Sequence, residues 1–556
     1  MMRFQTYKSW IEFILLVLVS AAIYLPFIGQ FGYYYDDWYS MYAARVGGTQ
    51  TFYEMYSIDR PGRAYIMIPL YMLFKGDPLY YNILAYILRL VGALLLLWVL
   101  RLIWQEQRFE TFLVAFLFLI YPGFLSMPNA IDFQSHLVAV CLVFLSFGIS
   151  IVAVSAQDLK IRVALWLGAA LTGWAYLSQM EYYLGFETVR VFLLGVVAWR
   201  EHLHWKQRIK RAFHTWLPYA PIPVLYLIWR LFFFNNERMQ TDVGLQLSVL
   251  QAAPIATLYD WFGNYIQSVL NVVLLAWGVP LSQLSFTLDT SNKIRGIALA
   301  LVIILISTLV ISYLRRVNGK SKEDSTNWRK EMLGVGILWT IGGLIIVILA
   351  NRSVVFPAYA RYGLVSAPGG IMILVAGLSF LSEKRVQLVI ISFLVFSGGF
   401  THYANGTVFA QSAERMRFFW WQVSWRIPQL EQGTTLVVQY PSTITEARDV
   451  WGPANHIYYP VQLNPNKILL GVNAILLDHN AVIRILLRER QVYRKEIIVE
   501  TYPNYRNILI LTQPTLNSCV HVIDGKQPEY SRHENDAILV VGPYSEVEHI
   551  SLQDEF

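Results

Sequence analysis

The sequence contains little cysteine and few of the motifs that mark soluble enzymes. Only 2 of its 556 residues are cysteine, namely Cys141 inside an apolar run and Cys519 in a polar tail, so no disulfide between them is expected. The sequence has neither a Walker-type phosphate loop nor the spacing of zinc ligands, which argues against a nucleotide-driven pump.

Charge is also scarce. Charged residues make up 15% of the chain against 56% hydrophobic residues, and the mean hydropathy is +0.43. This balance leaves too little polar surface for a soluble globule of this size. The formal net charge is +7, but the basic residues lie at the ends of apolar runs, so nucleic-acid binding is not expected. The composition predicts an all-α polytopic membrane protein.

Long apolar runs are what the sequence has in abundance. About 20 apolar residues are enough to cross roughly 30 Å of hydrocarbon. The first run lacks a small-residue cleavage site, which favours a retained helix over a signal peptide. Eleven spans are predicted, at about 11–30, 79–104, 111–127, 133–156, 163–180, 182–199, 215–234, 294–314, 332–351, 363–382 and 385–401.

The stretch 256–285 differs from these runs because polar residues and Pro280 interrupt it. It is predicted to be an interfacial or re-entrant helix pair. With that stretch left out of the spans, a cytoplasmic N-terminus gathers most Lys and Arg on the inner side, including the basic segment 315–330. The expected location is the cytoplasmic (inner) membrane, with many passes.

The composition changes near residue 402. Residues 1–401 are expected to form the transmembrane domain, 402–432 an interfacial helix or linker, and 433–556 a small extracytoplasmic α/β or β-rich domain. Indoles and arginines in 411–430 suit the headgroup region, although a plain tether is the alternative. Short β-like runs separated by turn residues are predicted at 435–439, 496–500, 508–511 and 537–541.

The unusual chemistry lies in the first outer loop, residues 32–75. There the adjacent carboxylates of Asp36 and Asp37 stand among aromatic residues such as Tyr33 and Trp38. Aromatic faces beside carboxylates suit a sugar, and a carboxylate can take the proton of an attacking hydroxyl. A tyrosine-rich interfacial belt is the alternative.

The segment from Tyr35 to Arg45 resembles the start of the first outer loop in membrane glycosyltransferases of the GT-C fold. The similarity is to the protein O-mannosyltransferase and aminoarabinose (lipid A) transferase group, in which an Asp-Glu pair follows the first span. Asp36 matches the Asp of that pair, whereas Asp37 replaces its Glu. Further matches, in order along residues 10–400, are Ala44-Arg45, Asp59-Arg60-Pro61, Arg89-Leu90 and Ala360-Arg361-Tyr362-Gly363-Leu364 with Pro368.

The resemblance implies an enzyme that moves a sugar from a polyprenyl-phosphate carrier to a protein, lipid or glycan acceptor outside the cytoplasmic membrane. Asp36 is then the expected general base, and Asp37 orients the acceptor or tunes its neighbour. The two carboxylates would be the obvious ligands of a divalent cation, but the group is regarded as metal-independent, so no metal or other cofactor is expected.

Basic residues are expected to bind the lipid phosphate. Arg352 and Arg361 flank a short outer loop and can clamp phosphate oxygens, with snorkelling at a span end as the alternative. Arg89 lies well inside its span, where it should touch phosphate or pair with an acid. The expected donor-phosphate residues are Arg89, Arg352, Arg361 and Tyr362.

Other polar residues are expected to line the substrate cavity. Asp132 and His136 share a helix face, although Asp132 could instead cap that helix. Glu187 and Arg190, at helical spacing, are read as an internal ion pair. The predicted cavity residues are Arg45, Asp59, Arg60, Asp132, His136 and Glu181.

Two other classes of function compete with the enzyme. One is a polytopic transporter or flippase, in which intramembrane charges mark a substrate path. The sequence shows no inverted repeat and no matched pair of broken helices in two halves, which disfavours this class. The other is a non-catalytic polysaccharide-assembly protein that uses its tail to contact partners.

Overall fold

A computed structural model describes residues 2–200, 204–234, 243–317, 326–439, 446–462, 468–476, 494–496, 498–524, 537–541 and 547–551. The chain divides into two compact units made of interleaved segments. The helical unit comprises Met1–Gly29, Ile58–Arg63 and Leu79–Val408. The mixed unit comprises Gln30–Ser57, Ala64–Pro78 and Phe409–Phe556. Both units therefore include part of the segment 32–75.

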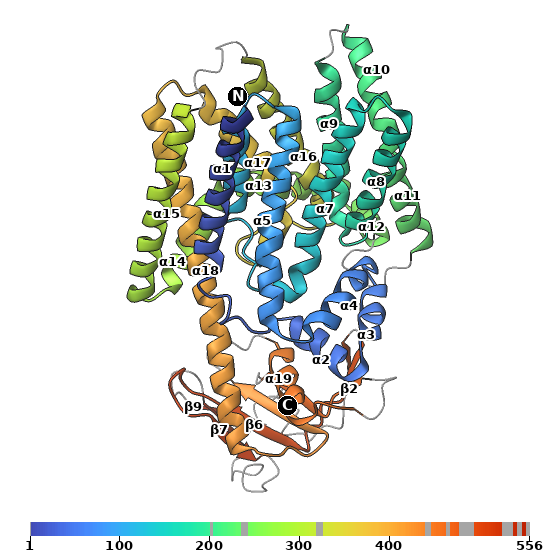
Figure 1. The fold of residues 1–556 in the computed structure, drawn as a ribbon. Coiled ribbons are helices and arrows are strands. Elements are labelled where there is room, and N and C mark those ends of the chain that lie inside the picture. Colours follow the sequence, from blue (N-terminus) through green and yellow to red (C-terminus); the bar gives the residue numbers. More distant parts are fainter. Residues whose placement is uncertain are drawn as a thin grey trace. The chain divides into compact units, whose positions relative to one another are not determined.

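Helices make up the helical unit (Figure 1). Short helical turns interrupt or connect them at η1 (Glu181–Leu184), η2 (Leu217–Tyr219), η3 (Trp229–Phe233), η5 (Leu275–Trp277) and η6 (Ala360–Gly363). The longer helices are α1 (Met2–Tyr24), α5 (Pro78–Ile103), α6 (Arg108–Leu119), α7 (Ala130–Ser155), α8 (Leu159–Leu177), α9 (Gly185–Trp199), α10 (Trp205–Trp216), α11 (Pro221–Ile228), α12 (Val243–Ala252), α13 (Pro254–Val273), α14 (Val279–Thr287), α15 (Thr290–Val317), α16 (Thr326–Leu349), α17 (Ala367–Phe380) and α18 (Lys384–Arg426), which continues into the mixed unit.

Several helices are long and apolar enough to cross a membrane. In the described part of the chain five single helices meet that standard, and two bent helix pairs raise the number to seven if each pair is one span. The predicted number of eleven spans stays a prediction. The five helices are Pro78–Ile103, Ala130–Ser155, Thr290–Arg316, Asn327–Leu349 and Lys384–Arg426.

The stretch 256–285 forms a bent pair of helices, and its predicted interfacial or re-entrant placement stays a prediction. Its two parts, Pro254–Val273 and Leu275–Thr287, meet at an angle of 48°. The polar side chains that interrupt its apolar run are used inside the unit: the Asn271 amide donates to the Val354 carbonyl at 2.6 Å, and the Ser268 hydroxyl accepts the Val354 N–H at 3.1 Å. These bonds hold the segment that precedes η6.

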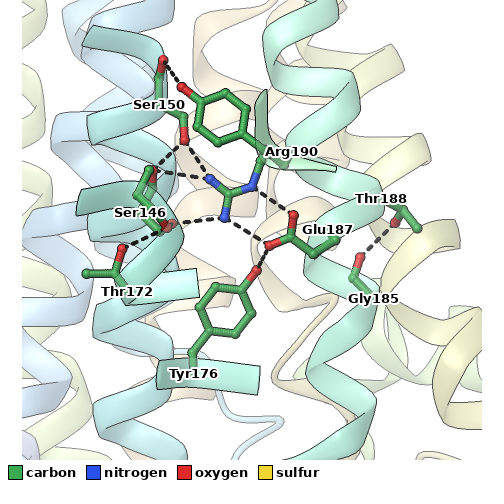
Figure 2. Close-up of polar contacts among 10 residues, drawn as sticks. Ser146, Ser150, Thr172, Tyr176, Gly185, Glu187, Thr188 and Arg190 are labelled. Carbon is green, nitrogen blue, oxygen red and sulfur yellow. Dashed lines mark hydrogen bonds and ion pairs between the residues drawn. The ribbon is translucent and has the colours of Figure 1, made fainter. Parts of the chain in front are cut away.

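The predicted ion pair between Glu187 and Arg190 is confirmed, and it joins three helices (Figure 2). The Arg190 guanidinium donates to both Glu187 oxygens at 2.9 Å, and it also reaches the hydroxyls of Ser150 at 2.5 Å and Ser146 at 2.9 Å on α7. The Tyr176 hydroxyl of α8 donates to Glu187. Arg190 and Glu187 are 1% and 4% exposed, so every charge here is met by a partner in an apolar interior.

Most of the segment 32–75 belongs to the mixed unit, and this segment is largely helical. The segment contains α2 (Asp37–Gly47), α3 (Gln50–Ser57) and α4 (Gly62–Phe74). The rest of the unit contains α19 (Arg448–Tyr458) and the strands β1 (Thr434–Gln439), β2 (Ile468–Leu469), β3 (Val472–Leu476), β4 (Arg494–Glu496), β5 (Val499–Thr501), β6 (Ile508–Thr512), β7 (His521–Asp524), β8 (Ala537–Val541) and β9 (Val547–Ser551).

The main sheet has the order β3-β1-β6-β7. β1 pairs in parallel with β3 and β6, and β7 is antiparallel to β6. A parallel pair needs a crossover, which α19 provides between β1 and β3. Val437, Ile475, Tyr505 and Ile508 form a buried core on this sheet. Smaller sheets are β2-β5-β4 and β8-β9. Of the two predicted types of tail, the α/β type is present; parts of 433–556 lie outside the described residues.

Helix α18 runs without a break for 43 residues. The predicted last span and most of the predicted interfacial segment 402–432 are therefore one helix, and the expected boundary at 401 lies within it. The carboxy-terminal end of α18 lies in the mixed unit and contacts the sheet region there. The side-chain oxygen of Gln422 accepts a hydrogen bond from the Val520 N–H at 2.9 Å.

Removing one partner of the buried pair should destabilise the helical unit. Arg190→Met leaves the Glu187 carboxylate buried without its cation, so the free energy of unfolding should fall by about 3–5 kcal/mol. Thermal unfolding in detergent measures this loss. The double variant Glu187→Gln/Arg190→Met should lose less, and Arg295→Met, at an exposed arginine of α15, should change little. Unfolding of Arg190→Met at the wild-type temperature would contradict the role of the pair.

Candidate active site

The two adjacent carboxylates of the first loop have different environments. The side chain of Asp36, just before α2, is 36% exposed and forms an ion pair with Arg448, whose side chain is 26% exposed. Asp37 is 1% exposed, and its Oδ2 accepts the N–H of Tyr34 at 3.1 Å. Asp37 therefore fixes the turn, whereas Asp36 is the carboxylate that a substrate can reach.

The turn before these residues is strained. Tyr35 has a φ of 48°, in the left-handed region that a bulky side chain rarely adopts. The hydrogen bond from Tyr34 to Asp37 closes this turn, and the Asp37 N–H donates to the Tyr34 carbonyl at 3.0 Å. Strained backbone that its surroundings over-determine is frequent at functional sites.

Helix α19 packs along α2 within the mixed unit, and we call this packing the α2–α19 contact. Gly452 is needed there, because an added Cβ would lie 2.6 Å from the Trp38 side chain. Further along, the Tyr42 hydroxyl donates to the Tyr459 carbonyl at 3.1 Å. Two hydrogen bonds between Asn455 and Val472 anchor α19 to β3. The sheet thus positions α19, and α19 holds α2.

An aromatic group surrounds His456 at the α2–α19 contact. The ring centroids of Tyr33, Trp38 and Tyr42 lie 5.7, 6.0 and 5.4 Å from that of His456. Burial, with the positive charge of Arg45 as the next cause, lowers the pKa of His456 to about 4. The imidazole is therefore neutral at pH 7, and its Nδ1 can accept the Arg45 hydrogen bond at 3.3 Å. This arrangement holds the predicted cavity residue Arg45.

A second polar group, which we call the arginine cluster, lies in the helical unit. Its members come from the loop before α4, the first turn of α4, the start of α7, η1, η3 and η6: they are Asp59, Arg60, Arg63, Asp132, His136, Glu181, Tyr182, Arg230, Arg361 and Tyr362. Seven of these ten are predicted site residues, so the fold brings together positions that lie far apart in the sequence.

Most charges of the cluster are paired. Arg60 donates two hydrogen bonds of 2.9 Å to Glu181, and a guanidinium nitrogen lies 3.7 Å from Asp59. Arg63 contacts the Asp132 carboxylate and carbonyl at 2.7 Å each. Asp132 is thus in an ion pair, and the residue at the N-cap of α7 is Asn129.

Arg230 and Arg361 are not in ion pairs with described residues: Arg230 donates to the Asp59 carbonyl, and Arg361 is framed by aromatic rings. The guanidinium carbon of Arg361 lies 4.9 Å from the ring centroid of Tyr362, 5.3 Å from that of Tyr359 and 6.0 Å from that of Phe133. Its side chain donates to the Ala358 carbonyl at 3.2 Å, and it forms no ion pair with any described residue. A partly exposed cation framed by rings, beside acids already engaged by other arginines, is suited to an anionic ligand.

His136 gives a second sign of a ligand near Arg361. The side chain is 3% exposed, and its Nδ1 is buried without a hydrogen-bond partner among the described residues. The imidazole lies 4.8 Å from the Phe133 ring and 6.3 Å from the Tyr182 ring, between centroids. Tyr182 in turn contacts the Tyr362 ring at 5.3 Å. An orphaned buried nitrogen in a wall of aromatic rings is costly unless something binds there.

Of the other two predicted donor-phosphate residues, Arg89 has its hydrogen bonds on α6, and the role of Arg352 stays a prediction. Arg89, 2% exposed on α5, donates to the carbonyls of Phe118 at 2.5 Å and Leu119 at 3.3 Å, and thereby satisfies the end of α6. The predicted alternatives for Arg89 were phosphate or an acid, and the structure shows carbonyls. Arg352 follows α16 and donates its backbone N–H to Val347 at 3.0 Å.

Sequence reasoning missed Arg63, Arg230 and Arg448 as site residues. Arg63 follows Arg60 by three positions in the same loop, which was an available signal. Arg230 donates to the Asp59 carbonyl at 2.7 Å, although the two residues are 171 positions apart in the sequence. No local sequence pattern predicts that contact. No group of three or more His, Cys, Asp or Glu side chains that could hold a metal ion occurs in the described ranges.

Comparison with known proteins gives a distant likeness among solved structures. No protein-family model matches the chain, and no curated protein matches it. Among solved structures, it is similar to the Archaeoglobus fulgidus oligosaccharyltransferase in complex with Zn and sulfate, with 13% sequence identity and a TM-score of 0.37. The match covers 81% of this chain and 62% of that protein, so the chain spans less than two thirds of its length. A likeness this distant carries no functional argument.

The class of the protein follows from its own composition and helices. It is a helical membrane protein with a small sheet-containing region near the carboxy terminus.

The glycine at the α2–α19 contact offers a direct test of the packing. Gly452→Ala should lower the free energy of unfolding of the mixed unit by about 1–3 kcal/mol, because the new Cβ meets Trp38. Gly377→Ala on α17, where a Cβ would meet nothing within 4 Å, is the matched control and should be neutral or stabilising. Equal thermal unfolding of the two variants would contradict the close approach.

The ion pair of Glu181 predicts a dependence of stability on acid. Burial alone would raise the pKa of the Glu181 carboxyl, but the charge and hydrogen bonds of Arg60 lower it to about 2, from 4.5. The stabilisation is therefore present above the unfolded value and is lost as the pH falls toward 2. Between about pH 5 and pH 3 the wild-type melting temperature should fall more steeply than that of Glu181→Gln. If the melting temperatures of the two proteins fell in parallel with pH, the stabilising role of the ion pair between Arg60 and Glu181 would be contradicted.

Proposed function

We propose that this protein is a membrane glycosyltransferase that moves a sugar from a polyprenyl-phosphate carrier to an acceptor outside the cytoplasmic membrane. The acceptor is a protein, a lipid or a glycan. The observation that carries the proposal is the arginine cluster, in which residues assigned to a phosphate and sugar site from the sequence lie together. Among its described members four guanidinium groups (Arg60, Arg63, Arg230 and Arg361) face three carboxylates (Asp59, Asp132 and Glu181), which leaves a positive charge for an anion.

Arg361 is the proposed ligand of the donor phosphate. Its guanidinium forms no ion pair in the described structure, and its planar fork matches two phosphate oxygens. Tyr362 and Tyr359 offer ring faces beside it, and His136 offers a buried nitrogen. Arg60 and Arg63 have their own acids and act by holding Glu181 and Asp132 in place. Arg89 is left out of this role, because its hydrogen bonds go to α6.

Asp36 is the proposed general base. Its carboxylate takes the proton of the acceptor hydroxyl while the hydroxyl oxygen attacks the anomeric carbon of the sugar. The bond from that carbon to the phosphate oxygen breaks, and polyprenyl phosphate leaves with the electron pair. The partial exposure of Asp36 and the aromatic side chains of Tyr33 and Trp38 nearby support this role. Asp37 is proposed to keep the turn that presents Asp36.

Substitution of Asp36 tests the proposed chemistry. Asp36→Asn should reduce transfer by about 10²–10⁴-fold, because the amide cannot accept the proton. The measurement is mass spectrometry of the products formed from synthetic farnesyl-phosphate hexoses and pentoses by the purified protein with membrane extract as acceptor. Asp289→Asn, at an acid that is fully exposed before α15, is the matched control and should keep full turnover. Normal turnover by Asp36→Asn would remove the assignment.

Substitution of Arg361 tests the donor site separately. Arg361→Ala should weaken the binding of farnesyl phosphate by about 10–100-fold, since a hydrogen bond to a charged group contributes about 1.5–3 kcal/mol. Arg361→Lys keeps the charge but lacks the planar guanidinium group, so its affinity for farnesyl phosphate should lie between those of the wild type and Arg361→Ala. Arg295→Ala on α15 should bind as the wild type does. Native mass spectrometry provides the affinities, and unchanged binding by Arg361→Ala would contradict this part of the proposal.

A further inference from the structure

The general base proposed for this protein is held by a residue from the other end of the chain. Arg448, the first residue of α19, donates from Nη1 to Oδ1 of Asp36, and the two residues are 412 positions apart. Both belong to the mixed unit. A contact over this distance exists only because the sheet region places α19 against the first loop.

The position of the Arg448 guanidinium is well determined by its neighbours. Glu446 accepts hydrogen bonds from Arg448 and so shares the guanidinium with Asp36. The Glu446 N–H donates to Asp449 Oδ2 at 3.1 Å, which closes the turn that leads into α19. The charges of Asp36 and Glu446 outweigh the cost of burial and raise the pKa of Arg448, so this cation is permanent at working pH.

The rest of the α2–α19 contact keeps Asp36 and Arg448 next to each other. One turn beyond Arg448, Gly452 receives Trp38, and at the far end His456 accepts from Arg45. Asn455 fixes α19 to β3 through hydrogen bonds of 2.7 and 3.0 Å. Arg448 is therefore mounted on a rigid element, which is the arrangement that best preserves the orientation of a functional group.

The geometry of the pair suits a base that must stay reachable. The described contact with Arg448 engages Oδ1 of Asp36, and the two side chains keep 36% and 26% of their surface exposed. A fully buried pair would be closed to a substrate, whereas a fully exposed carboxylate would have no fixed direction. The partial exposure of this pair combines a defined orientation with access from solvent.

We propose that Arg448 is the positioning residue of Asp36, so that the carboxy-terminal α/β region completes the catalytic base which the first loop provides. Arg448 keeps the Asp36 carboxylate ionised and directs it, and it takes no proton itself. This inference rests on the proposed function for its catalytic meaning, but the effect on Asp36 can be measured without any substrate.

The ionisation of Asp36 in the purified full-length protein provides the first test. A water-soluble carbodiimide with an amine labels protonated carboxyl groups, and peptide mass spectrometry locates the label. Loss of a neighbouring cation disfavours the ionised form, so in Arg448→Met the midpoint of Asp36 labelling should move to higher pH by about one unit. Charged and titratable groups that also surround the pair are Tyr35, Asp37, Tyr39, Glu446 and Asp449.

Matched variants separate this effect from general damage. Arg448→Lys retains a cation and should shift the labelling midpoint less than Arg448→Met. Arg426→Met removes an arginine of the same unit that bonds within its own helix, to Gln422, and should leave the midpoint unchanged. If Arg448→Met does not fold, Arg448→Lys and Arg448→Gln provide the same comparison. An unchanged midpoint in every Arg448 variant would overturn the proposal.

Turnover provides the second test and distinguishes the two hypotheses. With the farnesyl-phosphate sugar panel, Arg448→Met should lower kcat with little change in KM, and the acidic limb of its pH profile should move upward as the labelling does. A loss with Asp36→Asn but none with Arg448→Met would overturn the positioning role alone. Faster turnover in Arg448→Met would also overturn it, since the pair would then block the base. Full activity in Asp36→Asn would remove the proposed function while the labelling result stands.

Discussion

In an apolar interior a charged side chain has to meet an opposite charge or an array of carbonyls, because water is not there to solvate it. The helical unit obeys this constraint in several ways. Arg190 is met by Glu187 and two serine hydroxyls, and Arg89 by the last carbonyls of α6. Arg101 of α5 is met by Glu12 of α1 at 2.5 Å. Each of these pairings also ties one helix to another.

In the arginine cluster, Arg60 and Arg63 follow the same rule, whereas Arg230 and Arg361 form no ion pair with a described residue. Arg60 and Arg63 have their acids, and those acids are held in fixed directions by them. Arg361 has rings around it and a single carbonyl, while the nearby His136 keeps a buried nitrogen unsatisfied within the described structure. Groups of this kind in a well-packed unit are suited to bind a ligand. The difference between paired and unpaired groups in the cluster therefore indicates a ligand site better than the residue types alone do.

Local features of the fold could be read from the sequence. The pair Glu187 and Arg190 was predictable because three positions on a helix bring side chains together. The strands 434–439, 508–512 and 537–541 were predictable from short β-branched runs between turns. Contacts between distant segments were not. The pairing of Asp36 with Arg448, and the use of Asn271 to hold Val354, depend on tertiary packing that leaves no local pattern.

The way in which the mixed unit is assembled also has a consequence for biosynthesis. The strained turn at Tyr35 and helix α2 leave the ribosome long before α19 does, since Asp36 and Arg448 are separated by 412 residues. At ordinary rates of translation of about 5–20 residues per second, that interval lasts roughly 20–80 s. During this interval the amino-terminal segments of the mixed unit exist without the sheet that fixes them. The mixed unit is therefore completed only after the membrane-spanning helices that precede α19 have been made.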